Sequence, residues 1–323
     1  MQPSRSSPLL PPRAALFIAI LAVSTASIFV RFAQREASSL AISAYRLVIA
    51  ALVLLPVSIG ALRREVRWIG SRDLLWGFLS GVLLALHFAT WISSLQYTTV
   101  ASSVVLVSTA PLWVALFSPW ILKERLDRRV LIGLVVALAG GTVVGIGDAC
   151  QLRSGGLACL PLGQFFEGKA MWGNLLALVG AWCAAGYFMI GRSLRARLSL
   201  QTYIVGVYST AGLLLLGIAG LLRLPLTGFS HLTYFWLVCL GLIPQLIGHS
   251  AYNWSLKYLP ATDVSVALFG EPVGSTILAY LILGENPGWL KAAGGILILV
   301  GIYLAASRSD VPGDQAALTD LSQ

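Results

Sequence analysis

Two stretches of this chain follow one pattern. Residues 111–124 read PLWVALFSPWILKE, and residues 272–285 read PVGSTILAYLILGE. Each stretch begins with proline and ends with glutamate, and the offset between them, from Pro111 to Pro272, is 161 residues. Apolar sequence readily matches itself by chance, but prolines and glutamates that match at a single offset are much harder to obtain. The pattern therefore predicts an internal duplication.

Residues of other types recur at the same offset. They form two glycine pairs, one tyrosine pair and one arginine pair: Gly133 and Gly294, Gly140 and Gly301, Tyr97 and Tyr258, and Arg31 and Arg192. These matches extend the duplication over nearly the whole chain of 323 residues.

The composition places the chain in a membrane. Hydrophobic residues make up 57% of it, charged residues only 11%, and its mean hydropathy is +0.83, whereas soluble domains are about a quarter charged. The apolar runs are about 20 residues long without strand-like alternation, which favours spanning helices over barrel strands. We expect an all-α integral membrane protein with about ten transmembrane helices, at 14–33, 39–60, 73–95, 100–121, 129–147, 170–191, 201–222, 232–255, 262–283 and 289–306.

The positions of Lys and Arg predict the orientation. With the N-terminus in the cytoplasm, fifteen of them fall on the cytoplasmic side: Arg5, Arg13, Arg63, Arg64, Arg67, Arg72, Lys123, Arg125, Arg128, Arg129, Arg192, Arg195, Arg197, Lys257 and Arg308. Six fall on the outer side: Arg31, Arg35, Arg153, Lys169, Arg223 and Lys291. Basic residues favour cytoplasmic loops. We therefore expect both termini to lie in the cytoplasm. The membrane that we expect the chain to span is the inner membrane of a bacterium.

Ten spans and one duplication give about five helices per half. An odd number inserts the second half upside down, which is the inverted repeat of secondary transporters. Two such halves can exchange conformations and so open one site to either side of the membrane. The expected boundaries are a disordered segment 1–13, a first repeat 14–147, an extracytoplasmic loop 148–169, a second repeat 170–306 and a disordered tail 307–323.

These features resemble the drug/metabolite transporter superfamily, in particular its ten-helix group with two EamA domains. The motif that carries the resemblance reads Pro111, Glu124, Gly133 and Gly140 in one half, and Pro272, Glu285, Gly294 and Gly301 in the other. The resemblance implies a central cavity lined by the first four helices of each half. It also implies export or exchange of amino acids, related metabolites, drugs or, in more distant members, nucleotide sugars.

Glu271 is the first candidate site residue, because an ionisable side chain near mid-membrane is costly unless it is paired, hydrated or neutral. It could bind a substrate ammonium or carry a coupling proton, and the alternative is a structural hydrogen bond to a neighbouring helix. Arg46 could pair with Glu271, bind a substrate carboxylate, or extend its long side chain to the membrane surface. The residues at the equivalent positions of the repeat are Ala110 and Val207, so the duplication explains neither charge.

Polar aromatic residues form two further candidate groups. His87 and Trp91 lie one turn apart on the third expected helix, and so share a face. The eighth expected helix carries Gln245, His249, Tyr252 and Asn253. Each group could contact substrate, or could supply hydrogen bonds between helices.

The prolines and cysteines complete the candidate set. Pro111, Pro244 and Pro272 are expected to interrupt helices near mid-membrane, for gating or for a fixed bend. Cys150 and Cys159 fall in the longest loop, on the outer side, where the pair could form a disulfide. The repeated glycines lie two turns apart and predict close helix packing.

The sequence argues against other functions. The net charge of +9 is spread over short loops, which predicts no nucleic-acid partner. We find no nucleotide-binding loop, no His and Cys spacing typical of a metal site and no nucleophile–base pair. We therefore predict a non-enzymatic carrier without a cofactor, with the lipid bilayer, a small solute and possibly protons as its partners. A membrane receptor or scaffold is the less favoured alternative.

Overall fold

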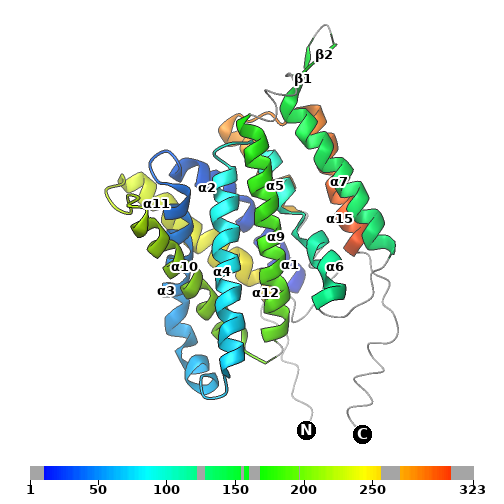
Figure 1. The fold of residues 1–323 in the computed structure, drawn as a ribbon. Coiled ribbons are helices and arrows are strands. Elements are labelled where there is room, and N and C mark those ends of the chain that lie inside the picture. Colours follow the sequence, from blue (N-terminus) through cyan, green and yellow to red (C-terminus); the bar gives the residue numbers. More distant parts are fainter. Residues whose placement is uncertain are drawn as a thin grey trace.

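The computed structural model describes residues 11–121, 128–153, 156–159, 168–195, 197–255 and 270–306. Within them the chain forms a bundle of long helices with a short β-hairpin at its edge (Figure 1). Residues 1–10 and the expected tail 307–323 lie outside the described residues, as do Glu124 and positions 262–269 of the ninth expected span.

The first half of the chain runs from α1 to α7. Its helices in the described residues are α1 (Pro12–Ser24), α2 (Ala26–Ala33), α3 (Ser39–Glu65), α4 (Ser71–Ser94), α5 (Val100–Val107), α6 (Ala110–Ile121) and α7 (Arg128–Ala149).

The second half of the chain runs from α9 to α15. Its described helices are α9 (Lys169–Arg195), α10 (Leu200–Leu221), α11 (His231–Leu240), α12 (Ser250–Ser255), α14 (Gly270–Leu278) and α15 (Gly288–Ala306), with the π-helices η1 (Gly241–His249) and η2 (Ala279–Leu283).

The ten expected spans are confirmed as helical segments. In the part of the chain that the structure describes, seven helices are long and apolar enough to cross a membrane, and three shorter apolar helices occupy the remaining spans. Large apolar side chains face outward from the bundle, as Val57 on α3 and Leu213 on α10 do with 66% of their surface exposed. Lipid tails can cover such a surface, whereas water could not do so without a large free-energy cost.

Two spans of the first half are broken by threonine. Thr25 separates α1 from α2, and its hydroxyl donates to the carbonyl of Ala22 at 2.7 Å. Thr109 lies between α5 and α6, and its hydroxyl donates to the carbonyl of Leu106 at 2.7 Å. A hydroxyl that takes an i−3 carbonyl competes with the helical hydrogen-bond ladder. Each break therefore has a local cause in the sequence.

Serine and threonine also begin several helices. The hydroxyls of Ser38, Thr99, Ser199 and Ser230 each accept from a backbone N–H three residues later, which satisfies a donor that the first turn leaves free. Ser38 and Ser199 stand at the 161-residue offset. The duplication therefore includes the start of an equivalent helix in each half.

The repeated glycines join α7 to α15, which lie side by side at one edge of the bundle (Figure 1). A Cβ on Gly140 would lie 2.7 Å from the carbonyl oxygen of Gly294, and one on Gly301 would lie 2.5 Å from that of Gly133. Only hydrogen fits at these crossings, so the predicted close packing is confirmed.

Two further extensive contacts also cross between the halves. Helix α3 packs along α10, and α4 packs along α9. Gly212 of α10 lies against Val48, and Gly81 of α4 lies against Thr210. The main apolar core lies between these helices and α2 and α11. Each half therefore covers the buried face of the other.

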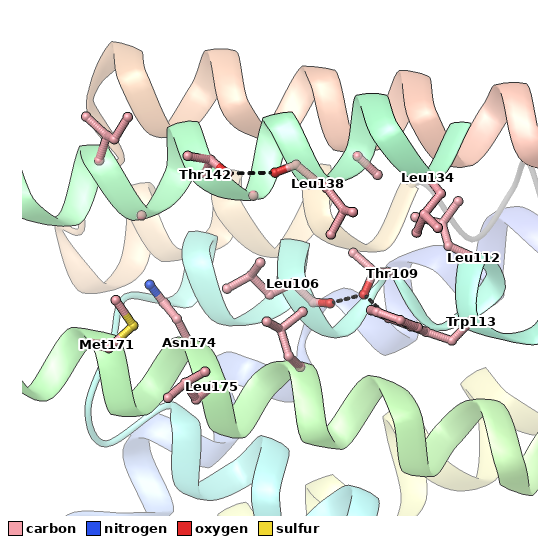
Figure 2. Close-up of a pocket in the computed structure, with 15 residues that line it drawn as sticks. Leu106, Thr109, Leu112, Trp113, Leu134, Leu138, Thr142, Met171, Asn174 and Leu175 are labelled. Atoms are coloured by element: carbon pink, nitrogen blue, oxygen red, sulfur yellow. Dashed lines mark hydrogen bonds between the residues drawn. The ribbon is translucent and has the colours of Figure 1, made fainter. Parts of the chain in front are cut away.

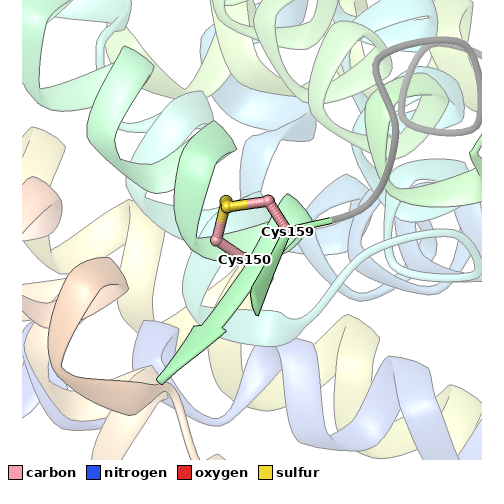
Figure 3. The surroundings of a disulfide bond; sticks show 2 residues. All are labelled: Cys150 and Cys159. Carbon is pink, nitrogen blue, oxygen red and sulfur yellow. A yellow bond between two sulfur atoms is a disulfide. The ribbon is translucent and has the colours of Figure 1, made fainter. Parts of the chain in front are cut away.

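A β-hairpin follows α7 and projects from the bundle (Figure 1). Strands β1 (Cys150–Arg153) and β2 (Gly156–Cys159) are antiparallel, with Cys150 opposite Cys159. A disulfide joins these two residues (Figure 3). The expected loop 148–169 thus contains a hairpin that was not predicted from the sequence.

Candidate functional site

Arg46 lies in the middle of the bundle. Helix α3 carries it, and only 1% of its surface is exposed. Its Nε donates to Oε1 of Gln245 at 2.8 Å, and Gln245 is also 1% exposed. Tyr208 of α10 is buried next to both residues. The alternative that Arg46 extends its side chain to the membrane surface is therefore wrong, because the side chain turns inward toward the second half.

Aromatic rings of α4 cover the guanidinium of Arg46. Its Cζ lies 4.2 Å from the centre of the Phe88 ring and 5.7 Å from that of Trp91. A cation over an aromatic face is stabilised by the ring quadrupole, and more so where water is excluded. The rings therefore replace part of the hydration that Arg46 loses on burial.

Glu271 lies on α14, close enough to Arg46 for the two charges to interact. Neither a hydrogen bond nor a direct ion pair joins them in the described residues. The neighbouring Gly270 packs against Ile20, and Gly274 packs against the hydroxyl of Ser24. Helix α14 thus presents its glutamate beside the broken first span.

Several buried polar atoms of the described residues lack a hydrogen-bond partner, among them atoms of Arg46 and Trp91. In the described residues, the buried atoms without a hydrogen bond include Nη1 of Arg46, Nε1 of Trp91, the Tyr252 hydroxyl, and Oγ of Ser24 and of Ser27. Buried polar groups in folded proteins are nearly always satisfied, and the exceptions often mark functional positions. We call Arg46, Phe88, Trp91, Gln245 and Glu271 the central site.

The histidines occupy different environments. Nδ1 of His87 lies 2.9 Å from the carbonyl oxygen of Gly180 on α9, and its ring stacks on Trp91. That contact matches the alternative of a hydrogen bond between helices. The ring of His249 meets Phe88 edge-on at 6.3 Å. The structure thus places His249 beside the central site, while the side chain of Asn253 lies outside the described residues.

The prolines are placed differently from one another. Pro111 is the second residue of α6, where the missing N–H costs no helical hydrogen bond. The break therefore precedes Pro111, at Thr109. Pro244 lies inside η1, and π-helical turns are frequent at functional sites. Pro272 is buried in α14, next to Glu271. The expected interruption lies directly before Pro111 and around Pro244. For Pro272 it stays a prediction, because residues 256–269 lie outside the described part of the chain.

A cluster of charged residues at the ends of the helices was not predicted from the sequence. Arg31 forms an ion pair with Glu285 at 2.8 Å and donates to the carbonyl of Thr98 at 2.9 Å. The other oxygen of Glu285 accepts from the backbone N–H of Val100, at the start of α5, where a helix favours negative charge. Arg31 and Glu285 both recur at the 161-residue offset, which marks them as notable. Nothing in the sequence indicates that these two residues contact each other.

A second ion pair lies nearby. Lys291 of α15 meets Asp148 of α7 at 2.6 Å. Asn174 of α9 donates to the other oxygen of Asp148 at 2.7 Å, and Ser102 of α5 donates at 3.3 Å. This carboxylate is 3% exposed. These contacts fasten α7 and α15 to the rest of the bundle.

A cavity of about 430 Å³ lies away from the central site, between α5, α6, α7 and α9 (Figure 2). It is lined mainly by apolar side chains, among them Leu106, Trp113 and Leu178. Leu138 and Leu175, also at its wall, are 53% and 45% exposed on the outside of the bundle. Acyl chains would reach this groove, so it differs in chemistry from the polar centre.

Several buried charges and polar groups at the crossing of two helical repeats define a class of membrane protein that binds solutes within the bilayer. The chain belongs to the EamA-like transporter family, which matches residues 13–146 and 171–307. It is therefore a multi-pass membrane transporter, and the resemblance noted in the sequence is confirmed.

Individual relatives are distant. An uncharacterised transporter of Archaeoglobus fulgidus is 25% identical, over 71% of this chain and 74% of its own length. The uncharacterised transporter YcxC of Bacillus subtilis is 24% identical, over 85% and 86%. A probable terminal-alkyne amino-acid exporter of Streptantibioticus cattleyicolor is 24% identical, over 70% and 73%.

A solved structure shares the fold. It covers 91% of this chain and 96% of its own, with a TM-score of 0.59 and 22% sequence identity. At this identity the likeness supports the arrangement of helices.

Proposed function

We propose that this transporter is a secondary carrier that exports a small amphipathic metabolite, such as an amino acid, by alternating access. The central site is the place where the solute binds. The membrane is the bacterial cytoplasmic membrane, both termini face the cytoplasm, and the cluster around Glu285 then faces outward. The excess of Lys and Arg in the opposite loops supports this orientation.

One observation carries the proposal. Arg46 on α3 and Glu271 on α14 come from different halves and lie close enough for their charges to interact, yet no direct ion pair joins them in the described residues. Opposite charges that remain apart in a low-dielectric interior are costly. A solute with a negative and a positive end would satisfy both.

The amino-acid class has a second support. The distant relative from Streptantibioticus cattleyicolor is named a probable exporter of an amino acid. A phosphorylated substrate fits less well, because Arg46 is the only Lys or Arg among the buried side chains of the described residues. Two or more negative charges would face Glu271 with a single cation to balance them.

Glu271 has two roles to distinguish. It binds the ammonium of the solute, or it carries the proton that drives exchange. The Glu271→Gln variant keeps the size of the side chain and removes its charge. We expect this variant to insert normally and to lose transport or its dependence on a pH gradient.

The measurement is flux of labelled amino acids in proteoliposomes, with and without a pH gradient. A panel of cationic dyes tests exchange of drugs as the alternative. Normal, pH-dependent transport by Glu271→Gln would show that Glu271 neither binds the ammonium nor carries the coupling proton. Flux of dyes without flux of amino acids would change the substrate class.

A further inference from the structure

The guanidinium of Arg46 is held in one orientation. Gln245 takes the Nε hydrogen, and Phe88 covers one face of the group. Of the two Nη atoms, Nη1 has no hydrogen-bond partner in the described residues. The guanidinium is planar and its donors form a fixed fork, so the Nη1 hydrogens point in a defined direction.

Trp91 offers a second donor beside it. The centre of its ring lies 5.7 Å from Cζ of Arg46, and its indole N–H is buried without an acceptor. Two buried N–H donors without acceptors in the described residues, on neighbouring side chains, suit a group with two acceptor oxygens. A carboxylate is such a group, and hydrogen bonds from ionised donors to it are among the strongest in proteins.

The second half provides a different pair. Trp91 and Tyr252 stand at the 161-residue offset, and both are buried with an unpartnered polar hydrogen. Tyr252 interacts with Glu271, whereas Trp91 lies beside Arg46. The duplication thus supplies one hydrogen-bond donor to each half. Arg46 makes the end of the site near Trp91 cationic, and Glu271 makes the end near Tyr252 anionic.

We propose that Arg46 and Trp91 form the carboxylate-binding end of the transport site, so that a solute is bound only if it carries a carboxylate. The inference rests on the proposed transport function and names the group that the site selects. Glu271 limits the choice further, because its charge repels a phosphate with two negative charges.

The chain offers matched variants for a test. Arg46→Gln removes the charge, and Arg46→Lys keeps it without the planar fork. Trp91→Phe keeps an aromatic ring and removes only the indole N–H. Trp182→Phe is the control, because Trp182 is 46% exposed and contacts Trp113, away from the central site.

Three probes with the same isobutyl side chain test the carboxylate and the ammonium of a solute separately. L-leucine has both charges, 4-methylvalerate has only the carboxylate, and L-leucinamide has only the ammonium. Binding is measured as an apparent Kd by thermal-shift titration of the full chain in detergent. We expect L-leucine and 4-methylvalerate to bind and L-leucinamide to bind at least tenfold more weakly.

The variants should weaken carboxylate binding in order. Arg46→Gln is expected to raise the apparent Kd of 4-methylvalerate about 10- to 100-fold, as for loss of a charged hydrogen bond. Trp91→Phe should raise it about 3- to 10-fold, and Trp182→Phe should leave it unchanged. Arg46→Lys should fall between the wild type and Arg46→Gln. If Arg46→Gln does not fold, Arg46→Lys and Trp91→Phe still give the comparison.

The outcomes separate this inference from the proposed function. If 4-methylvalerate binds through Arg46 but no amino acid is transported, the inferred carboxylate site is supported and the proposed amino-acid export is contradicted. Equal binding of L-leucinamide and L-leucine, or an unchanged Kd in Arg46→Gln and Trp91→Phe, would overturn the inference. Failure of every carboxylate probe to bind the wild type would overturn it as well.

Discussion

Charged residues inside this bundle are stabilised in two different ways. Asp148 and Lys291 form a direct ion pair, to which Asn174 adds a hydrogen bond. Arg46 instead has a neutral amide and two aromatic rings as neighbours. The first arrangement satisfies the charges within the protein, and the second leaves donors free. A stabilising role fits the first and a binding role fits the second.

The ion pair between Arg31 and Glu285 has a measurable role in stability. Arg31→Gln and Glu285→Gln should each lower the free energy of unfolding, since each leaves a partly buried charge unpaired. The double variant should be little worse than either single one, with a coupling energy on the order of 1 kcal/mol. Unfolding in detergent gives these energies.

Arg35→Gln provides the comparison for this cycle. Arg35 lies over the Phe32 ring, 5.2 Å from its centre, and forms no ion pair with Glu285 among the described residues. It should change stability little. Fully additive losses in the double variant would show that Arg31 and Glu285 do not act as a pair.

Helices in this bundle differ in how their glycines are used. Gly301 of α15 packs against the backbone of α7, where a Cβ would lie 2.5 Å from the oxygen of Gly133 and 2.7 Å from the nitrogen of Ala137. Backbone atoms cannot give way as a flexible side chain does. Gly217 of α10 has no atom within 4 Å of an added Cβ. The same substitution should therefore have opposite effects at the two positions.

Gly301→Ala should destabilise the protein by about 1–3 kcal/mol, because α7 and α15 must separate. Gly217→Ala should be neutral or stabilise it by up to about 1 kcal/mol, because alanine favours helix. Thermal unfolding of the two purified variants makes the comparison. Equal melting temperatures would contradict the packing that we assign to α7 and α15.

The helical architecture follows from patterns that the sequence displays. Length, hydropathy and the 161-residue offset predict ten spans in two repeats. The glycine positions predict close helix packing, but not that α7 and α15 are the helices that meet. The break before Pro111 is expected from the proline, whereas the hydrogen bond from the Thr109 hydroxyl to the carbonyl of Leu106 cannot be read from the sequence. The hairpin from Cys150 to Cys159 was missed because strands of four residues carry little periodicity.

The central site was only partly predictable. Arg46 and Glu271 stand out as charges in apolar runs that the duplication does not repeat, but the sequence could not place Gln245 against Arg46. Phe88 was missed because it reads as an ordinary core residue. Which faces of α3, α4 and η1 meet depends on how the helices rotate against one another, and that is set by packing across the halves.

The whole molecule joins its two halves at its centre and at one end. Arg46 with Gln245 links α3 to η1 at the centre, and Arg31 with Glu285 links α2 to the segment after η2. In the proposed orientation the second link is extracytoplasmic. A carrier that alternates would keep the first region as its binding site and separate the helices around the second.

Counterflow in proteoliposomes tests the central claim most directly. Vesicles are loaded with unlabelled L-leucine, diluted into a trace of labelled L-leucine, and followed over time. A carrier with alternating access should accumulate label transiently above the outside concentration, and Arg46→Gln should abolish this overshoot. Equilibration of the label without an overshoot in the wild type, or an equal overshoot in Arg46→Gln, would contradict the account.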